Sequence, residues 1–158
     1  MKYRNRMFAM ALLCWCYAVR AAGGGSESSA DTSSADPVIA AAQSAISQKN
    51  WEAAQSTLRK ALAGNPQHAD YHNLYAYALR KSANPSMDEV FGHYAEALRI
   101  DPKHRGAHEY MGEAYLMVNN LPKAREHLAA LDKLCFFGCE EYKDLKLAIA
   151  NYEAKQRR

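Results

Sequence analysis

The feature that most constrains this fold is an internal repeat in the C-terminal part of the chain. An Ala-Leu pair followed by a proline after a fixed interval occurs over 61–66 and again over 97–102. The two prolines, Pro66 and Pro102, lie 36 residues apart. Proline stops a helix, and a period of this length is typical of chains built from stacked helix pairs. The sequence therefore predicts a repetitive all-α fold.

The composition agrees with helices. Apolar residues make up 49% of the 158 residues, and they are rich in Ala, Leu and Tyr but poor in Val and Ile, which favours helix over sheet. We expect the first six helices to form three pairs and the seventh, with apolar residues along one face, to cap the exposed end of the stack. The expected helices span 37–48, 51–63, 69–82, 87–100, 104–118, 121–134 and 140–155.

The repeat resembles the tetratricopeptide repeat (TPR). The third unit carries "HEYMGEAYL", with the Met-Gly pair and Tyr that match the first helix of this family. The resemblance implies a right-handed α-solenoid of about three TPR helix pairs over 37–68, 69–103 and 104–134, with the Cys-turn and capping helix over 135–158. A generic helical bundle is the alternative. Matching positions in the other units include Ala42, Ala54, Leu58 and Ala61, then Tyr75, Ala76, Leu79, Val90, Tyr94 and Ala97.

The pattern has a physical reason. We expect the small residues Ala42, Ala76 and Gly112 to let the two helices of each unit approach closely. We expect the large residues at 58, 94 and 128 to fill the seam to the following unit. The second unit contains Pro85 in a longer loop between its two helices. Proline there forbids a continuous helix.

The N-terminus predicts export. A basic start, an apolar run over 7–19 and small residues before position 21 read as a signal peptide over 1–21, followed by a flexible Gly/Ser/Asp-rich linker over 22–36. An uncleaved anchor is the alternative. Cleavage would leave 16 basic against 17 acidic residues instead of 20 against 17. The mature chain is then near neutral and gives no reason to expect a nucleic-acid partner or further membrane contact. We expect a periplasmic or secreted protein.

No catalytic or cofactor motif is present in the sequence. There is no glycine-rich phosphate loop after a strand, no His-Glu-x-x-His zinc helix and no nucleophile elbow. The pairs His68/His72 and His104/His108 could each share a helix face and bind a metal weakly, but solvated surface histidines are the favoured interpretation. We therefore predict no enzyme activity, no cofactor and no catalytic residue.

The resemblance implies a peptide-binding groove lined by the first helix of each unit. Its mixed aromatic, apolar and charged character suits recognition of a protein or peptide, whose identity the sequence does not give. Ordinary solvated surface is the alternative at each position. Apolar residues of the first unit, Ile39 and Ile46, leave self-association open. The predicted partner-binding residues are Asn73, Tyr77, Arg80, Glu109, Glu113 and Leu116.

Two cysteines, Cys135 and Cys139, lie four positions apart with Gly138 between them. In an oxidising compartment such a pair defaults to a disulfide, and Gly138 allows the helix break that a bridge requires. Phe136 or Phe137 is expected to pack beneath the cap. A redox pair or a copper(I) site remains as an alternative, whereas a structural zinc site would need more ligands.

Together these features predict a non-enzymatic periplasmic TPR scaffold that binds a protein or peptide through its concave face. The alternative is an accessory factor in envelope redox or metal handling that uses Cys135 and Cys139. A third possibility is a domain whose main role is self-association. The stretch "LCFFGCEEYKDLKLAI" resembles the C-terminal part of small exported TPR proteins of Gram-negative bacteria.

Overall fold

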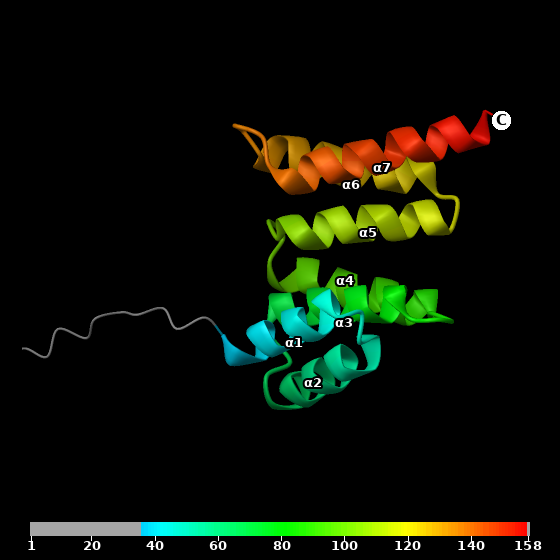
Figure 1. The fold of residues 1–158 in the computed structure, drawn as a ribbon. Coiled ribbons are helices and arrows are strands. Elements are labelled where there is room, and N and C mark those ends of the chain that lie inside the picture. Colours follow the sequence, from blue (N-terminus) through cyan, green and yellow to red (C-terminus); the bar gives the residue numbers. More distant parts are fainter. Residues whose placement is uncertain (1–35, 158) are drawn as a thin grey trace, which may run out of the picture. The chain divides into compact units, whose positions relative to one another are not determined.

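The computed structural model describes residues 36–157. The predicted signal peptide (1–21) and all of the predicted linker (22–36) except Asp36 lie outside the described residues. Within them the structure is all-α (Figure 1). The helices are α1 (Pro37–Ser47), α2 (Trp51–Gly64), α3 (Ala69–Lys81), α4 (Met87–Ile100), α5 (Arg105–Met117), α6 (Leu121–Leu134) and α7 (Glu140–Gln156).

The helices pack as antiparallel pairs that stack in chain order. Each of α1–α2, α3–α4 and α5–α6 forms one pair, and α7 packs on α5 and α6. Consecutive first helices touch each other, from α1 to α3, α3 to α5 and α5 to α7. No comparable contact joins α2 to α4 or α4 to α6 within residues 36–157. The stack is therefore curved with α1, α3, α5 and α7 on its inner side, and the predicted α-solenoid with a C-terminal capping helix is confirmed.

Local sequence signals set the helix boundaries. The side chains of Asp36, Asn50, Ser86 and Asn120 accept hydrogen bonds from backbone N–H groups in the first turns of α1, α2, α4 and α6. Asp36 also accepts a bond from the hydroxyl of Tyr71 at 2.7 Å, which ties the start of α1 to α3. The starts of these four helices are therefore set by residues next to them in the sequence.

The turns inside the first and third units share one geometry. Lys49 and Asn119 both adopt positive φ, +57° and +58°, two residues after the end of a helix. In each case the next residue closes the turn, with Asn50 N–H bonded to Ala45 O and Asn120 N–H bonded to Tyr115 O. This is the Schellman ending of a helix, in which the left-handed residue satisfies the last free carbonyls. The second unit instead has the predicted longer loop over 82–86.

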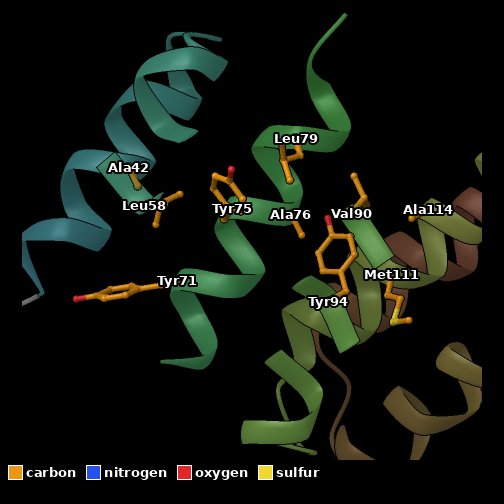
Figure 2. Close-up of a cluster of buried hydrophobic side chains, with 10 residues drawn as sticks. All are labelled: Ala42, Leu58, Tyr71, Tyr75, Ala76, Leu79, Val90, Tyr94, Met111 and Ala114. Atoms are coloured by element: carbon orange, nitrogen blue, oxygen red, sulfur yellow. The ribbon is translucent and has the colours of Figure 1, made fainter. Parts of the chain in front are cut away.

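The core is divided along the stack. Figure 2 shows the larger cluster, in which residues of α3 such as Tyr75 and Ala76 lie between Leu58 of α2 and Tyr94 of α4. Leu58 and Tyr94, two of the predicted seam residues, are fully buried. The smaller cluster joins α6 to α7 through Ala124, Leu131, Leu145 and Ile149, with Leu128 packed against it.

Gly112 differs from its predicted role. It was expected to admit the other helix of its own unit. Instead a Cβ at this position would lie 2.6 Å from Cδ2 of Leu145, so the glycine admits α7. The capping helix is thus packed as closely as a repeat helix.

No helix within residues 36–157 is long and apolar enough to cross a membrane.

Candidate functional site

The candidate site is the inner face of the stack, the surface presented by α1, α3, α5 and α7. Two of the predicted residues, Arg80 of α3 and Glu113 of α5, meet across the contact between the second and third units. Nη2 of Arg80 donates to Oε2 of Glu113 at 2.7 Å. Arg80 is only 5% exposed, so it lies beneath the surface of this face and offers little area to a partner.

An aromatic row crosses this face above Arg80. The ring of Tyr77 lies 4.7 Å from that of Tyr110 in α5 and 6.3 Å from that of Trp51 in α2, measured between centroids. The Arg80 guanidinium carbon lies 5.4 Å from the Tyr77 ring and 5.8 Å from the Tyr110 ring. Lys81 places its Nζ 5.3 Å from the Tyr77 centroid. Half-buried rings held by a cation offer rigid apolar contact area for a partner.

Tyr110 was missed as a member of this face, and Trp51 of α2 was missed as an aromatic neighbour of Tyr77. The sequence assigned the groove positions by repeat spacing, and that spacing gives Glu113 as the equivalent of Tyr77. Tyr110 lies one helical turn before Glu113 and therefore on the same side of α5. The sequence signal for Tyr110 was its position one helical turn from Glu113, a predicted groove residue.

A pocket of about 300 Å³ opens between α5 and α7 on the same side. We call it the acidic pocket. Two predicted residues, Glu109 and Glu113, line it, but the α7 residues were missed because α7 was treated only as a cap. Its lining is Glu109, Glu113, Asp144, Leu147, Ala148 and Asn151.

Glu109 is the least ordinary residue of the acidic pocket. It is 8% exposed, and its carboxyl has no hydrogen-bond or ion-pair partner among residues 36–157. Burial raises the pKa of Glu109 to about 8, with further contributions from the carboxylates of Glu113, Asp144 and Glu141. Arg80 opposes this shift. A buried carboxyl without a partner is costly to ionise, so the pocket is poised to accept a compensating positive charge.

The two remaining predicted residues lie apart from the pocket. Asn73 is 5% exposed, and its Oδ1 has no hydrogen-bond partner in the described part of the chain. A Cβ at Gly106 would lie 3.2 Å from Nδ2 of Asn73, which shows how closely α5 approaches α3 there. Leu116 is half-buried and packs against the smaller core cluster. The structure thus places Tyr77, Arg80, Glu109 and Glu113 close together. Asn73 and Leu116 lie outside this group.

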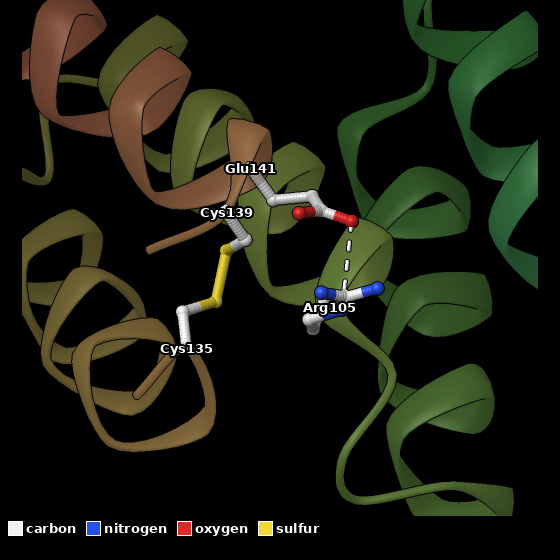
Figure 3. Close-up of a disulfide and its surroundings, with 4 residues drawn as sticks. All are labelled: Arg105, Cys135, Cys139 and Glu141. Carbon is white, nitrogen blue, oxygen red and sulfur yellow. Dashed lines mark ion pairs between the residues drawn. A yellow bond between two sulfur atoms is a disulfide. The ribbon is translucent and has the colours of Figure 1, made fainter. Parts of the chain in front are cut away.

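The cysteine pair forms a separate feature at the junction of α6 and α7. Figure 3 shows the bond between the sulfurs of Cys135 and Cys139, which are 2.02 Å apart. Gly138 adopts φ +82°, the left-handed conformation that the predicted break requires. Glu141, just beyond the bridge, lies 3.6 Å from Nε of Arg105 in α5 (Figure 3).

The prediction that Phe136 or Phe137 packs beneath the cap is wrong. Their side chains are 88% and 98% exposed, and the two rings contact each other with centroids 5.3 Å apart. The short loop turns both side chains outward. Leu131, Leu145 and Ile149 occupy the space beneath the cap instead.

The prediction that the histidines are solvated surface residues fails for His72, which is 8% exposed. Nδ1 of His72 lies 2.8 Å from Nδ1 of His93, and Nδ1 of His108 lies 3.0 Å from Nδ1 of His127. The histidines pair between the two helices of a unit, rather than along one helix. Nε2 of His72 contacts the carbonyl of Pro66 and Nε2 of His108 that of Pro102, so the arrangement repeats.

These contacts assign the protons of each pair. A carbonyl only accepts, so Nε2 of His72 and of His108 must donate to the proline oxygens. In the neutral rings Nδ1 of these residues then accepts a bond from Nδ1–H of His93 or His127. Both ring nitrogens of His72 and of His108 therefore have partners. The two pairs join α3 to α4 and α5 to α6.

One group of three possible metal ligands occurs among the described residues. It consists of Cys135, Cys139 and Glu141, whose ligand atoms lie within 4.8 Å of one another. Both sulfurs are used by the disulfide, and a bonded sulfur is not the thiolate that metals prefer. A metal could therefore bind here only after reduction.

Comparison with known proteins supports the fold. No family model matches the sequence, and no curated protein is similar to it by sequence. Among solved structures, the type III secretion translocator chaperone SycD of Yersinia enterocolitica is similar, with a TM-score of 0.63 and 14% identity. The match covers 77% of this chain and 92% of the chaperone chain. At this identity the likeness concerns the fold, and the chain has a TPR-like helical repeat.

Proposed function

We propose that this chain is a non-enzymatic scaffold that binds a segment of another protein on its inner face. The observation that carries the proposal is the aromatic row of Trp51, Tyr77 and Tyr110 lying beside the acidic pocket. Aromatic residues held in place at low entropic cost, next to unpaired polar groups, are typical of protein-binding surfaces. The fold is shared with a translocator chaperone, which adds support for a protein as partner.

We further propose that the chain is a small exported TPR protein of the Gram-negative type with a disulfide-bonded cap. The support is the basic and apolar N-terminus of the sequence together with the Cys135–Cys139 bond, which suits an oxidising compartment. The mass of the protein recovered from cells tests this. Loss of residues 1–21 is expected, and recovery of the uncleaved chain in the membrane fraction contradicts cleavage.

Site-specific photo-crosslinking tests the binding face. A photoreactive residue placed at Lys81 or Leu147, both exposed on the inner face, should crosslink a partner protein in cells. The matched positions are Lys60 in α2 and Asp132 in α6, which are exposed on second helices. The Tyr77→Ala substitution should weaken the inner-face crosslink without unfolding the protein. Equal crosslinking from the control positions contradicts the proposal.

A redox or metal role is a second candidate because one observation favours it, the proximity of Cys135, Cys139 and Glu141. In this case the pair would cycle to the reduced state in the cell. Trapping with an alkylating reagent before lysis separates the candidates. A pair that is always protected from alkylation supports a structural bridge, whereas a substantial alkylated fraction supports the second candidate.

A further inference from the structure

We infer that the acidic pocket between α5 and α7 binds the cationic end of a lysine or arginine side chain from a peptide segment. The inference rests on the proposed function and adds the chemistry of the partner. It assigns a ligand to a place where the described residues supply three carboxyl groups and no free cation.

The charges around the acidic pocket are not balanced. Arg80 is the basic residue that approaches it from α3, and its Nη2 is already bound to Glu113 at 2.7 Å. Neither Glu109 nor Asp144 has an ion-pair partner among residues 36–157. Two carboxyl groups of the acidic pocket are therefore left for an external cation, which carboxylates bind through short charge-assisted hydrogen bonds.

Glu109 supplies an independent reason to expect a ligand. Glu109 is more than nine-tenths buried as a residue, and the part of it that lines the pocket is its carboxyl, which has no protein hydrogen-bond partner within the described structure. A protonated amine or guanidinium entering the pocket would provide that partner. It would also relieve the repulsion between Glu109 and the carboxylates of Glu113, Asp144 and Glu141.

The apolar part of the lining suits a long basic side chain. Leu147 is 60% exposed at the pocket, and Ala148 lies beside it. Lysine and arginine reach a charged group through several methylenes, which pack favourably on apolar surface while the head group pairs with carboxylates. A small inorganic cation would leave this apolar lining unused.

The direct test is a titration of the ¹⁵N-labelled protein followed by NMR. The probe is N-acetyl-lysine N-methylamide, and its neutral match is N-acetyl-norleucine N-methylamide. The lysine probe should shift the amide signals of Glu109, Glu113 and 144–148 in a saturable way, and the norleucine probe should not. At about pH 8.5, where Glu109 is largely ionised, Glu109→Gln combined with Asp144→Asn should weaken lysine binding by about tenfold, because two charged acceptors are lost.

A matched control uses Glu52→Gln with Asp132→Asn, which removes two exposed carboxylates from α2 and α6. This variant should bind the lysine probe like the original protein. If the two double variants bind equally, or if norleucine shifts the same signals as strongly as lysine, the inference is overturned. Crosslinking from Lys81 and Leu147 would still stand in that case, so failure of the inference is distinguishable from failure of the proposed function.

Two further measurements sharpen the assignment. Glu109 faces Arg80 of α3, Glu113 of its own helix and Asp144 and Glu141 of α7, and its raised pKa means that lysine binding should tighten as pH rises from 6.5 to about 8.5. Glu109→Gln should abolish that dependence; its persistence would overturn the role of Glu109.

The source of the cation is tested through the chain's own basic end, which contains Lys155, Arg157 and Arg158. Dimers in sedimentation that disappear when these three are replaced by alanine identify a second copy as the source. Monomers exclude a second copy as the source.

Discussion

Arg80 and Glu113 form a 2.7 Å ion pair that joins the second repeat to the third from beneath the inner face. The Arg80 side chain is 4% exposed and the Glu113 side chain 27%. Arg80 is therefore shielded from water, whereas Glu113 is partly accessible to it. The same residues that shape the candidate binding surface therefore hold two repeats together.

Replacing Glu113 by Gln should lower the free energy of unfolding by about 2 kcal/mol, because it leaves a buried guanidinium without its counter-charge. Adding Arg80→Met should recover much of this loss, since the pair as a whole is costly to desolvate. Urea unfolding of the two single variants and the double variant measures the coupling. Additive effects of the two substitutions would contradict a direct interaction.

Gly112→Ala should destabilise the protein by about 1–3 kcal/mol, because the new Cβ would lie 2.6 Å from a terminal carbon of the fully buried Leu145. Leu145→Val in the same chain should restore part of the loss by removing that carbon. Gly92→Ala is the control, since nothing lies within 4 Å of its Cβ position in α4. It should stabilise by about 0.5–1 kcal/mol. Thermal unfolding compares the three, and equal loss from Gly112→Ala and Gly92→Ala would contradict the steric explanation.

The fold was predictable because its signals are local. The expected ranges 87–100 and 121–134 match α4 and α6, whose first turns are capped by the nearby side chains of Ser86 and Asn120. The repeat spacing then fixed the stacking order. Each of these signals acts within a few residues, and a single sequence displays it directly.

The candidate site was only partly predictable because it depends on how separate helices meet. Repeat spacing placed Glu109 and Glu113 on the inner face. The orientation of α7, which turns Asp144 and Leu147 toward them, could not be predicted from the sequence. The pairing of His72 with His93 likewise joins residues from two helices, whereas sequence spacing relates residues along one helix. Contacts of this kind arise from tertiary packing, which periodicity does not encode.

Lys49→Gly should stabilise the protein by about 0.5–1 kcal/mol, because lysine here adopts a left-handed conformation that glycine reaches without steric cost. Asn119→Gly, at the equivalent turn, should give no gain. Asparagine tolerates this conformation, and its Oδ1 accepts a bond from the hydroxyl of Tyr152 at 3.2 Å that glycine would lose. Chemical unfolding measures both changes; a larger gain at 119 than at 49 contradicts the reasoning.

Reduction of the Cys135–Cys139 disulfide should lower stability by about 2 kcal/mol, since the bridge closes a short loop in the unfolded chain. The effect should concentrate on α7, whose backbone amides should exchange hydrogen faster after reduction while those of α3 change little. A Cys135→Ser/Cys139→Ser variant should match the reduced protein and ignore reductant. If the original protein and this variant respond alike to reductant, the bridge is not the cause.

Acid should weaken the fold through the histidine pairs. Burial lowers the pKa of His127 to about 4, and the neighbouring His108 adds to the shift. Burial likewise lowers the pKa of His93, with a contribution from His72. The unfolded chain holds these imidazoles at their ordinary pKa of about 6.5, so between pH 6.5 and 4 it binds protons that the folded chain does not. The free energy of unfolding therefore falls as the pH falls through this window.

For His127, allowing for its partial exposure, the loss should amount to about 1–2 kcal/mol between pH 6.5 and pH 4. His127→Gln should remove this part of the pH dependence, and His68→Gln, outside both pairs, should retain it. Urea unfolding of the three proteins at several pH values gives the comparison. Carboxylates titrate over the same range in all three, so the difference between the original and His127→Gln slopes reports the paired imidazole. His68→Gln, which loses a 3.6 Å contact to Asp36, shows the effect of removing an imidazole outside the pairs. Parallel slopes would mean that the His108–His127 contact does not hold His127 in its neutral form.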